Sequence, residues 1–86
     1  MFERRAVIQN PSGLHARPAS QLTAYCKKLP VKITLLHGET KADPKSIISL
    51  LAAGMKRGTE ITVQVEGENE DEIGEGLLLF LAQLAE

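Results

Sequence analysis

The 86-residue chain lacks most of the side chains that hold small proteins together covalently or through metals. It has a single cysteine, Cys26, which cannot form an internal disulfide, and its two histidines belong to no cluster with metal-ligand spacing. Its longest apolar run, Leu77 to Ala82, has six residues, whereas a membrane-spanning helix needs about 20. We therefore expect a fold that depends on burial alone, with no metal, no cofactor and no membrane insertion.

Aromatic residues are also scarce, at 3% of the chain, and none is interleaved with the basic residues. Single-stranded nucleic acids are bound on aromatic stacking platforms, so this composition disfavours nucleic acid as a partner. The N-terminal residues lack the long apolar stretch and cleavage site of a signal peptide, which predicts a cytoplasmic protein. The length fits one small domain over residues 1–86, which we expect to be monomeric.

Charge is distributed unevenly, although the net charge is only −1. Residues 1–58 contain all ten basic residues and three acidic ones, while residues 59–86 contain eight acidic residues and no basic one. The cationic part favours an acidic partner or a phosphate group, and the acidic part is typical of a solvated helix face.

Hydrophobic periodicity predicts the secondary structure. Alternating apolar residues predict strands at residues 2–8, 31–36, 40–42 and 61–65, and apolar residues at helical spacing predict helices at 16–29, 46–53 and 70–84. The order βαββαβα, with one-sided helices, predicts an α+β open-faced two-layer sandwich: a four-stranded antiparallel sheet covered on one face by three helices. Gly74 and Gly76 each cost about 1 kcal/mol inside a helix, and Leu78 and Leu79 extend its apolar surface beyond one face. The last helix is therefore expected either to be irregular or to present an exposed apolar patch.

The segment Ser12-Gly13-Leu14-His15-Ala16-Arg17-Pro18-Ala19 places a histidine at the start of the first predicted helix. A helix N-terminus has unpaired N–H groups and about half a positive charge, so it stabilises a bound anion by about 0.3–1 kcal/mol. A neutral imidazole can attack phosphorus, and the backbone N–H groups of Ala16 and Arg17, with the Arg17 guanidinium, could hold the transferred phosphate. On local physics alone, a surface or helix-capping histidine is the commoner explanation of His15.

The run Leu14-His15-Ala16-Arg17-Pro18-Ala19 resembles the phosphohistidine motif of the HPr family, the histidine-containing phosphocarriers of the bacterial phosphotransferase system. The resemblance extends over nearly the whole chain. It implies a phosphocarrier, rather than an enzyme with its own turnover, that accepts phosphate on His15 from Enzyme I and passes it to IIA domains of sugar permeases. Arg17 is then expected to stabilise the phosphate.

A second block, Asp43 to Leu51, resembles the family's second helix. The resemblance implies that Ser46 is a regulatory phosphorylation site for HPr kinase/phosphorylase, with a catabolite-control transcription regulator as a further partner. Ser46 is also a good helix N-cap, and capping alone explains a serine at this position.

The same block contains three apolar residues, Ile47, Ile48 and Leu51, that cannot all face the sheet from so short a helix. At least one of them is therefore expected to be exposed. The resemblance implies that these residues, together with Lys45, dock partner proteins.

Two alternatives remain open at this point. One is a nitrogen-branch or regulatory HPr paralogue, although His15 argues against a paralogue that lacks the histidine. The other is a small βαββαβ module that binds a ligand or RNA, although the scarcity of aromatic residues counts against RNA.

Overall fold

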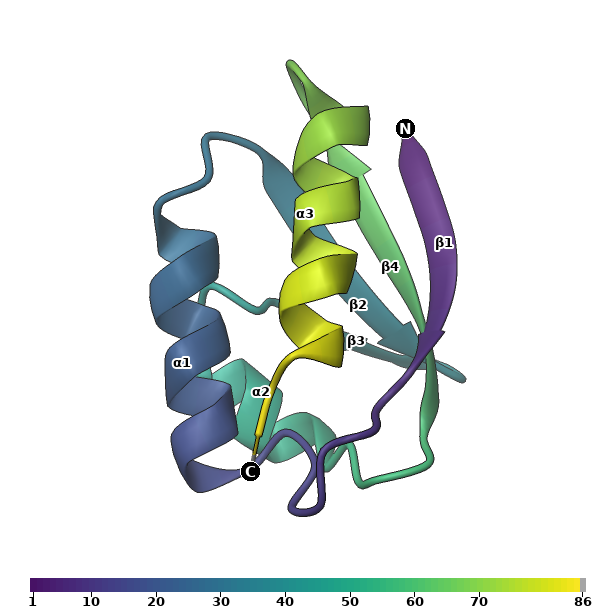
Figure 1. The fold of residues 1–86 in the computed structure, drawn as a ribbon. Coiled ribbons are helices and arrows are strands. Elements are labelled where there is room, and N and C mark those ends of the chain that lie inside the picture. The colour runs from purple at the N-terminus through teal and green to yellow at the C-terminus, as the bar shows by residue number, and fades with distance from the viewer. Residues whose placement is uncertain (86) are drawn as a thin grey trace.

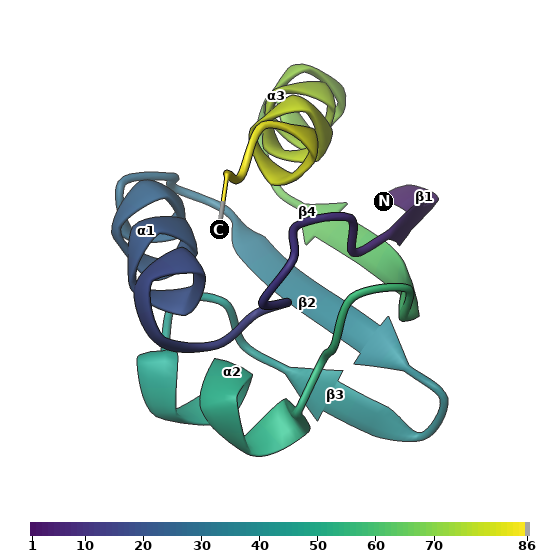
Figure 2. The ribbon, with the colours of Figure 1, turned by 60° about the horizontal axis from the view of Figure 1, so that its bottom comes forward.

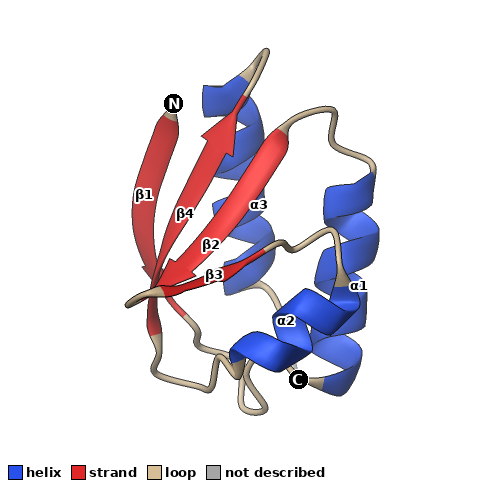
Figure 3. Ribbon diagram, turned by 180° about the vertical axis from the view of Figure 1, so that it is seen from behind, coloured by secondary structure: helices blue, strands red, loops and turns tan. Residues whose placement is uncertain are grey.

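The four strands form one antiparallel sheet in the order β1-β4-β2-β3. In this computed structural model, which describes residues 1–85, α1 and α3 cover one face of the sheet, and α2 packs against α1 and β3 (Figures 1 and 3). The elements are β1 (Phe2–Val7), α1 (Ala16–Lys27), β2 (Lys32–His37), β3 (Thr40–Ala42), α2 (Ile47–Ala53), β4 (Glu60–Glu66) and α3 (Glu70–Ala82). The predicted α+β open-faced sandwich is thus confirmed. Within residues 1–85, no helix is long and apolar enough to cross a membrane.

The core lies between the sheet and the helices, because each strand turns its apolar residues to the covered face. The fully buried side chains include Leu14, Leu22, Leu35, Leu50, Ile61, Val63, Val65 and Leu77. The opposite face of the sheet carries polar residues, such as Gln64, whose amide Nε2 donates a 2.9 Å hydrogen bond to Glu3 Oε1 on the neighbouring strand. This alternation is why only one face of the sheet is covered by helices.

Helix α1 ends at Lys27 rather than at the predicted Leu29. The backbone N–H of Lys28 points to the carbonyls of Tyr25 and Cys26, so the last turn tightens before Pro30 and the helix closes early. Strand β2 correspondingly begins at Lys32, one residue later than predicted.

Helix α3 is continuous from Glu70 to Ala82, so the predicted irregularity is wrong. Gly74 lies against the ring of Phe2 in β1, where a Cβ would come within 2.3 Å of Phe2 Cδ1. A Cβ on Gly76 would lie 3.2 Å from the hydroxyl of Tyr25. Both glycines therefore allow the helix to approach an aromatic side chain. The alternative prediction, an exposed apolar residue on this helix, holds for Leu79, which is 60% exposed.

Candidate functional site

His15 is the N-cap residue of α1 and its side chain is exposed. Its backbone is extended (φ −135°, ψ 157°), and its imidazole makes no capping hydrogen bond to the helix. The first-turn N–H groups of any helix lack intrahelical acceptors, so His15 lies where an anion is stabilised. The predicted position of the histidine at a helix entrance is therefore confirmed.

Ala16, the first residue of α1, has a φ of +43°, which is uncommon for a residue with a side chain. Such a conformation costs on the order of 1–3 kcal/mol, and it persists only where the surrounding structure holds it. Here Pro18 and Ala19, in the same helical turn, are buried and fix the start of the helix. The backbone therefore changes from the extended conformation of His15 to the helix within one residue. Arg17, in the first turn of that helix, has an exposed side chain.

The loop before His15 is fastened at two points. Asn10, which is 3% exposed, donates from Nδ2 to the carbonyl oxygen of Gly13 at 2.7 Å, and Gly13 N–H donates to the Asn10 carbonyl at 3.1 Å. Leu14 N–H donates to the carbonyl of Met55 at 2.8 Å, so the loop is joined to the segment that follows α2 (Figure 2). Gly13 has a φ of +65°, and a Cβ there would lie 2.5 Å from Met55 O. His15 thus projects from a loop with a fixed backbone.

Ser46 is the N-cap residue of α2, and its Oγ accepts a 3.2 Å hydrogen bond from Ser49 N–H. Its neighbours form a short chain of bonds: Asp43 N–H donates to Ser49 Oγ at 2.8 Å, and Lys45 N–H donates to Asp43 Oδ1 at 2.9 Å. The helix has seven residues and ends at Gly54, whose φ is +63°. Ser46 therefore caps α2 through its side chain.

The three apolar residues of α2 are all partly exposed, which confirms the prediction that at least one of them is. Ile47 is 38% exposed, Ile48 77% and Leu51 40%. Only Leu50 in this helix is buried. Since α2 packs beside α1, the exposed apolar residues and His15 belong to neighbouring elements (Figures 1 and 2).

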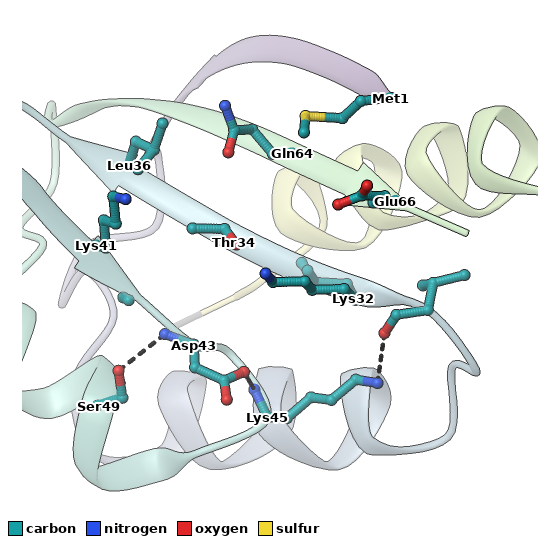
Figure 4. A pocket seen from close by; sticks show the side chains of 13 residues that line it. Met1, Lys32, Thr34, Leu36, Lys41, Asp43, Lys45, Ser49, Gln64 and Glu66 are labelled. Atoms are coloured by element: carbon teal, nitrogen blue, oxygen red, sulfur yellow. Dashed lines mark hydrogen bonds between the residues drawn. The ribbon is translucent and has the colours of Figure 1, made fainter.

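Lys45 is placed differently from the other predicted docking residues. Its Nζ donates to the carbonyl oxygens of Leu29 at 2.7 Å and Val31 at 2.6 Å, in the connection between α1 and β2. The ammonium thus ties the start of α2 to this connection, as Figure 4 shows for one of the two bonds. Its docking role stays a prediction.

A surface hollow and the Cys26 thiol lie outside this site. A hollow of about 680 Å³ lies along β2 beside the 43–49 segment, lined by polar groups such as Lys32, Thr34 and Gln64 (Figure 4). His15 is not among its lining residues. Cys26 is a buried core residue, and its burial raises the pKa of the thiol to about 12. Among residues 1–85, no group of His, Cys, Asp or Glu could hold a metal ion.

Sequence reasoning missed the contacts that fasten the His15 loop. The residues Asn10 to Gly13 are typical of a turn, but nothing in their sequence predicts that the Asn10 side chain is buried. The contact of Gly13 with Met55 joins segments about forty residues apart, so no local pattern encodes it.

Comparison with known proteins identifies the family of this chain. The model of the family described as "PTS HPr component phosphorylation site" matches residues 2–83. The phosphocarrier protein HPr of Mycoplasma capricolum is 42% identical over 72 residues, which cover 84% of this chain and 81% of that protein. The phosphocarrier protein HPr of Lysinibacillus sphaericus is 36% identical over 84 residues, covering 98% of this chain and 96% of that protein. The crystal structure of HPr-C-His from Thermoanaerobacter tengcongensis superposes with a TM-score of 0.90 at 29% identity, covering 95% of this chain and 92% of that one.

The matching family model and the relatives named above are those of phosphocarrier proteins, so the class is that of a carrier rather than of an enzyme. The chain belongs to the HPr family of phosphocarrier proteins of the phosphotransferase system.

Proposed function

We propose that His15 is the residue that carries the phosphoryl group, taking it from phosphorylated Enzyme I and giving it to IIA domains of sugar permeases in the cytoplasm. The observation that carries this proposal is an exposed imidazole at the N-cap of α1 that makes no hydrogen bond to its own helix. Both ring nitrogens are therefore available for chemistry. The second histidine, His37, is the last residue of β2, at the β2–β3 turn, and it is the N-cap of no helix.

The transfer step needs a nucleophile and a place for negative charge. One neutral ring nitrogen of His15 attacks phosphorus; an N–P bond forms, and the bond between phosphorus and the donor breaks. The charge of the phosphoryl oxygens is stabilised by the N-terminus of α1 and by the Arg17 guanidinium. Transfer to an acceptor reverses these steps, so no net change in the carrier remains.

Ser46 is proposed as a second, regulatory phosphorylation site, for HPr kinase/phosphorylase. Its Oγ makes one accepted hydrogen bond, from Ser49 N–H, and the residue is only partly buried. A phosphate at this helix N-terminus is compatible with the helix dipole, so α2 would remain folded. It would add about 1.5 to 2 negative charges beside the exposed Ile47 and Ile48.

The exposed apolar residues Ile47, Ile48 and Leu51 are the proposed docking patch for these partners and for a catabolite-control transcription regulator. Lone apolar surface residues are ordinary, but three on two turns next to α1 form a contiguous group. A phosphate on Ser46 could therefore alter binding of a partner that contacts both α1 and α2.

The proposal is tested by incubating the chain with phosphoenolpyruvate and Enzyme I and mapping the phosphate. An acid-labile phosphate on His15 is expected, and it should be absent from His15→Ala but present in His37→Ala. Phosphate on His37, or continued relay by His15→Ala, would overturn the assignment.

A further inference from the structure

The segment after α2 is a fixed turn that carries two adjacent cations, Lys56 and Arg57. Lys56 N–H donates to Thr59 Oγ1 at 3.1 Å, and Thr59 N–H donates back to the Lys56 carbonyl at 3.0 Å. Gly58 has a φ of +88°, which closes the turn between them. These reciprocal bonds hold the backbone of Lys56 and Arg57 in one place.

This turn, residues 56–59, is fastened to the loop that presents His15. Gly58 N–H donates to the Ile8 carbonyl at 2.7 Å, and Ile8 N–H donates to the Thr59 carbonyl at 2.9 Å. The turn also contacts the loop closer to the histidine. The Cα of Lys56 lies so near Gly13 that a Cβ on Gly13 would be only 2.8 Å from it. The two basic residues therefore start from backbone that touches the residue two positions before His15.

Lys56 and Arg57 have no ion-pair partner among residues 1–85, and both side chains are exposed. Two of the other eight cations are held by bonds: Arg4 pairs with Glu75 at 3.0 Å, and the Lys45 ammonium is bonded to two carbonyls. Two adjacent like charges without an ion-pair partner in the described part of the chain create a local positive potential. That potential borders the site where phosphate is transferred.

We propose that the 56–59 turn is a second cationic contact for the acidic protein surface that docks on His15, with Lys56 and Arg57 meeting partner carboxylates. This inference rests on the proposed function, because its partners are the proteins that exchange phosphate with His15. Charges at the rim of an interface mainly raise the rate of encounter and make it sensitive to salt. The turn therefore sets how fast an acidic partner is captured, and it leaves the chemical step to His15.

The test compares two double variants with the same change in net charge. Lys56→Glu/Arg57→Glu reverses the turn, and Lys32→Glu/Lys41→Glu reverses two exposed lysines on β2 and β3, away from the His15 loop. At low salt we expect the first variant to lower kcat/KM for phosphorylation by Enzyme I by roughly 10- to 100-fold, chiefly through KM. The difference from wild type should shrink at 0.5 M salt, where the screening length is only a few ångströms. The control should change kcat/KM by less than about threefold.

Two controls accompany this comparison. Unchanged thermal unfolding shows that the turn variant is folded, and Lys56→Arg/Arg57→Lys should retain the wild-type rate because the charges remain. Equal slowing of both double variants, or no slowing of either, would overturn the role of the turn.

Binding of unphosphorylated Enzyme I to His15→Ala is measured separately by calorimetry, with and without the turn substitutions. Weaker binding on reversal of the turn supports the inference even if His15 proves not to be the phosphorylated residue. Binding that is unaffected by the turn substitutions overturns it.

Discussion

Gly74 of α3 lies directly against the ring of Phe2 in β1, with room for no side chain between them. The two residues are 72 positions apart, and their contact joins the last helix to an edge strand of the sheet. The Arg4 guanidinium, 5.0 Å from the centroid of the same ring, also pairs with Glu75. The Phe2 ring is therefore covered by α3 on one side and approached by Arg4.

Gly74→Ala should destabilise the protein although alanine is the better helix former. The helix gains about 1 kcal/mol, but the new methyl group would lie 2.3 to 2.5 Å from three ring carbons of Phe2, and overpacking of this kind costs about 1–3 kcal/mol. We expect a lower urea midpoint with an unchanged m-value.

Gly76→Ala is the matched control on the same helix. Its new methyl group would meet only the Tyr25 hydroxyl, at 3.2 Å, the end of a side chain that can shift slightly. This variant should be as stable as wild type or more stable. A Gly74→Ala protein with the wild-type midpoint would contradict the close contact.

Asn10→Ala should lower both stability and phosphoryl transfer. It removes the 2.7 Å bond to Gly13 O and leaves a carbonyl of a buried residue unpaired, which costs about 1–3 kcal/mol. The His15 loop loses one of its two fastenings, so the imidazole signals in NMR spectra should broaden or shift. Gln9→Ala, at an exposed neighbouring position, is the control and should leave both properties intact.

Arg17→Lys should slow the relay while the fold stays unchanged. Lysine keeps the charge but loses the planar fork that donates two parallel bonds to phosphate oxygens. A loss of about tenfold in kcat/KM, equivalent to about 1.4 kcal/mol, is expected in assays with Enzyme I. Lys27→Arg, in the last turn of the same helix, serves as the control. Normal rates in Arg17→Lys, without dependence on ionic strength, would refute the role of the guanidinium.

Ser46→Asp should keep its melting temperature, because aspartate is also a good N-cap, while phosphorylation of His15 slows. A coupling of 1–3 kcal/mol, common between linked sites, corresponds to a loss of about 5- to 150-fold, and the loss should ease at high salt. Ser46→Asn caps the helix without adding charge, so it separates the two effects. Equal rates for all three proteins, with no labelling of Ser46 by an ATP-dependent kinase, would leave only the capping role.

The Cys26 thiol should be inert in the folded protein and should make stability fall at alkaline pH. Because burial raises its pKa from 9.0 to about 12, the thiol stays neutral in the folded chain while it ionises in the unfolded chain above about pH 9. The contribution is complete below pH 9 and is lost at roughly 1 kcal/mol per pH unit until about pH 12. Urea titrations of wild type and Cys26→Ala at pH 8 and 10 measure this slope. An equal slope in the two proteins would contradict it.

The sequence predicted most of the fold because its periodicities are local. Strand alternation and the positions of His15 and Ser46 at helix starts depend on residues within one or two turns. The regular course of α3 could not be predicted, since the cost of Gly74 is local while its benefit depends on Phe2. The hydrogen bond from Leu14 N–H to the Met55 carbonyl, which joins the His15 loop to a distant segment, is likewise a tertiary property.

The two carbonyl bonds of Lys45 have a consequence for its neighbour Ser46. An ammonium that donates to Leu29 O and Val31 O is held at the junction of α1 and β2, so it is not available as a counterion for a phosphate on Ser46. The dianion would draw its compensating charge from dissolved cations or from basic side chains of whatever protein binds there. A partner that recognises the modified form would therefore need to bring its own arginine or lysine to the start of α2.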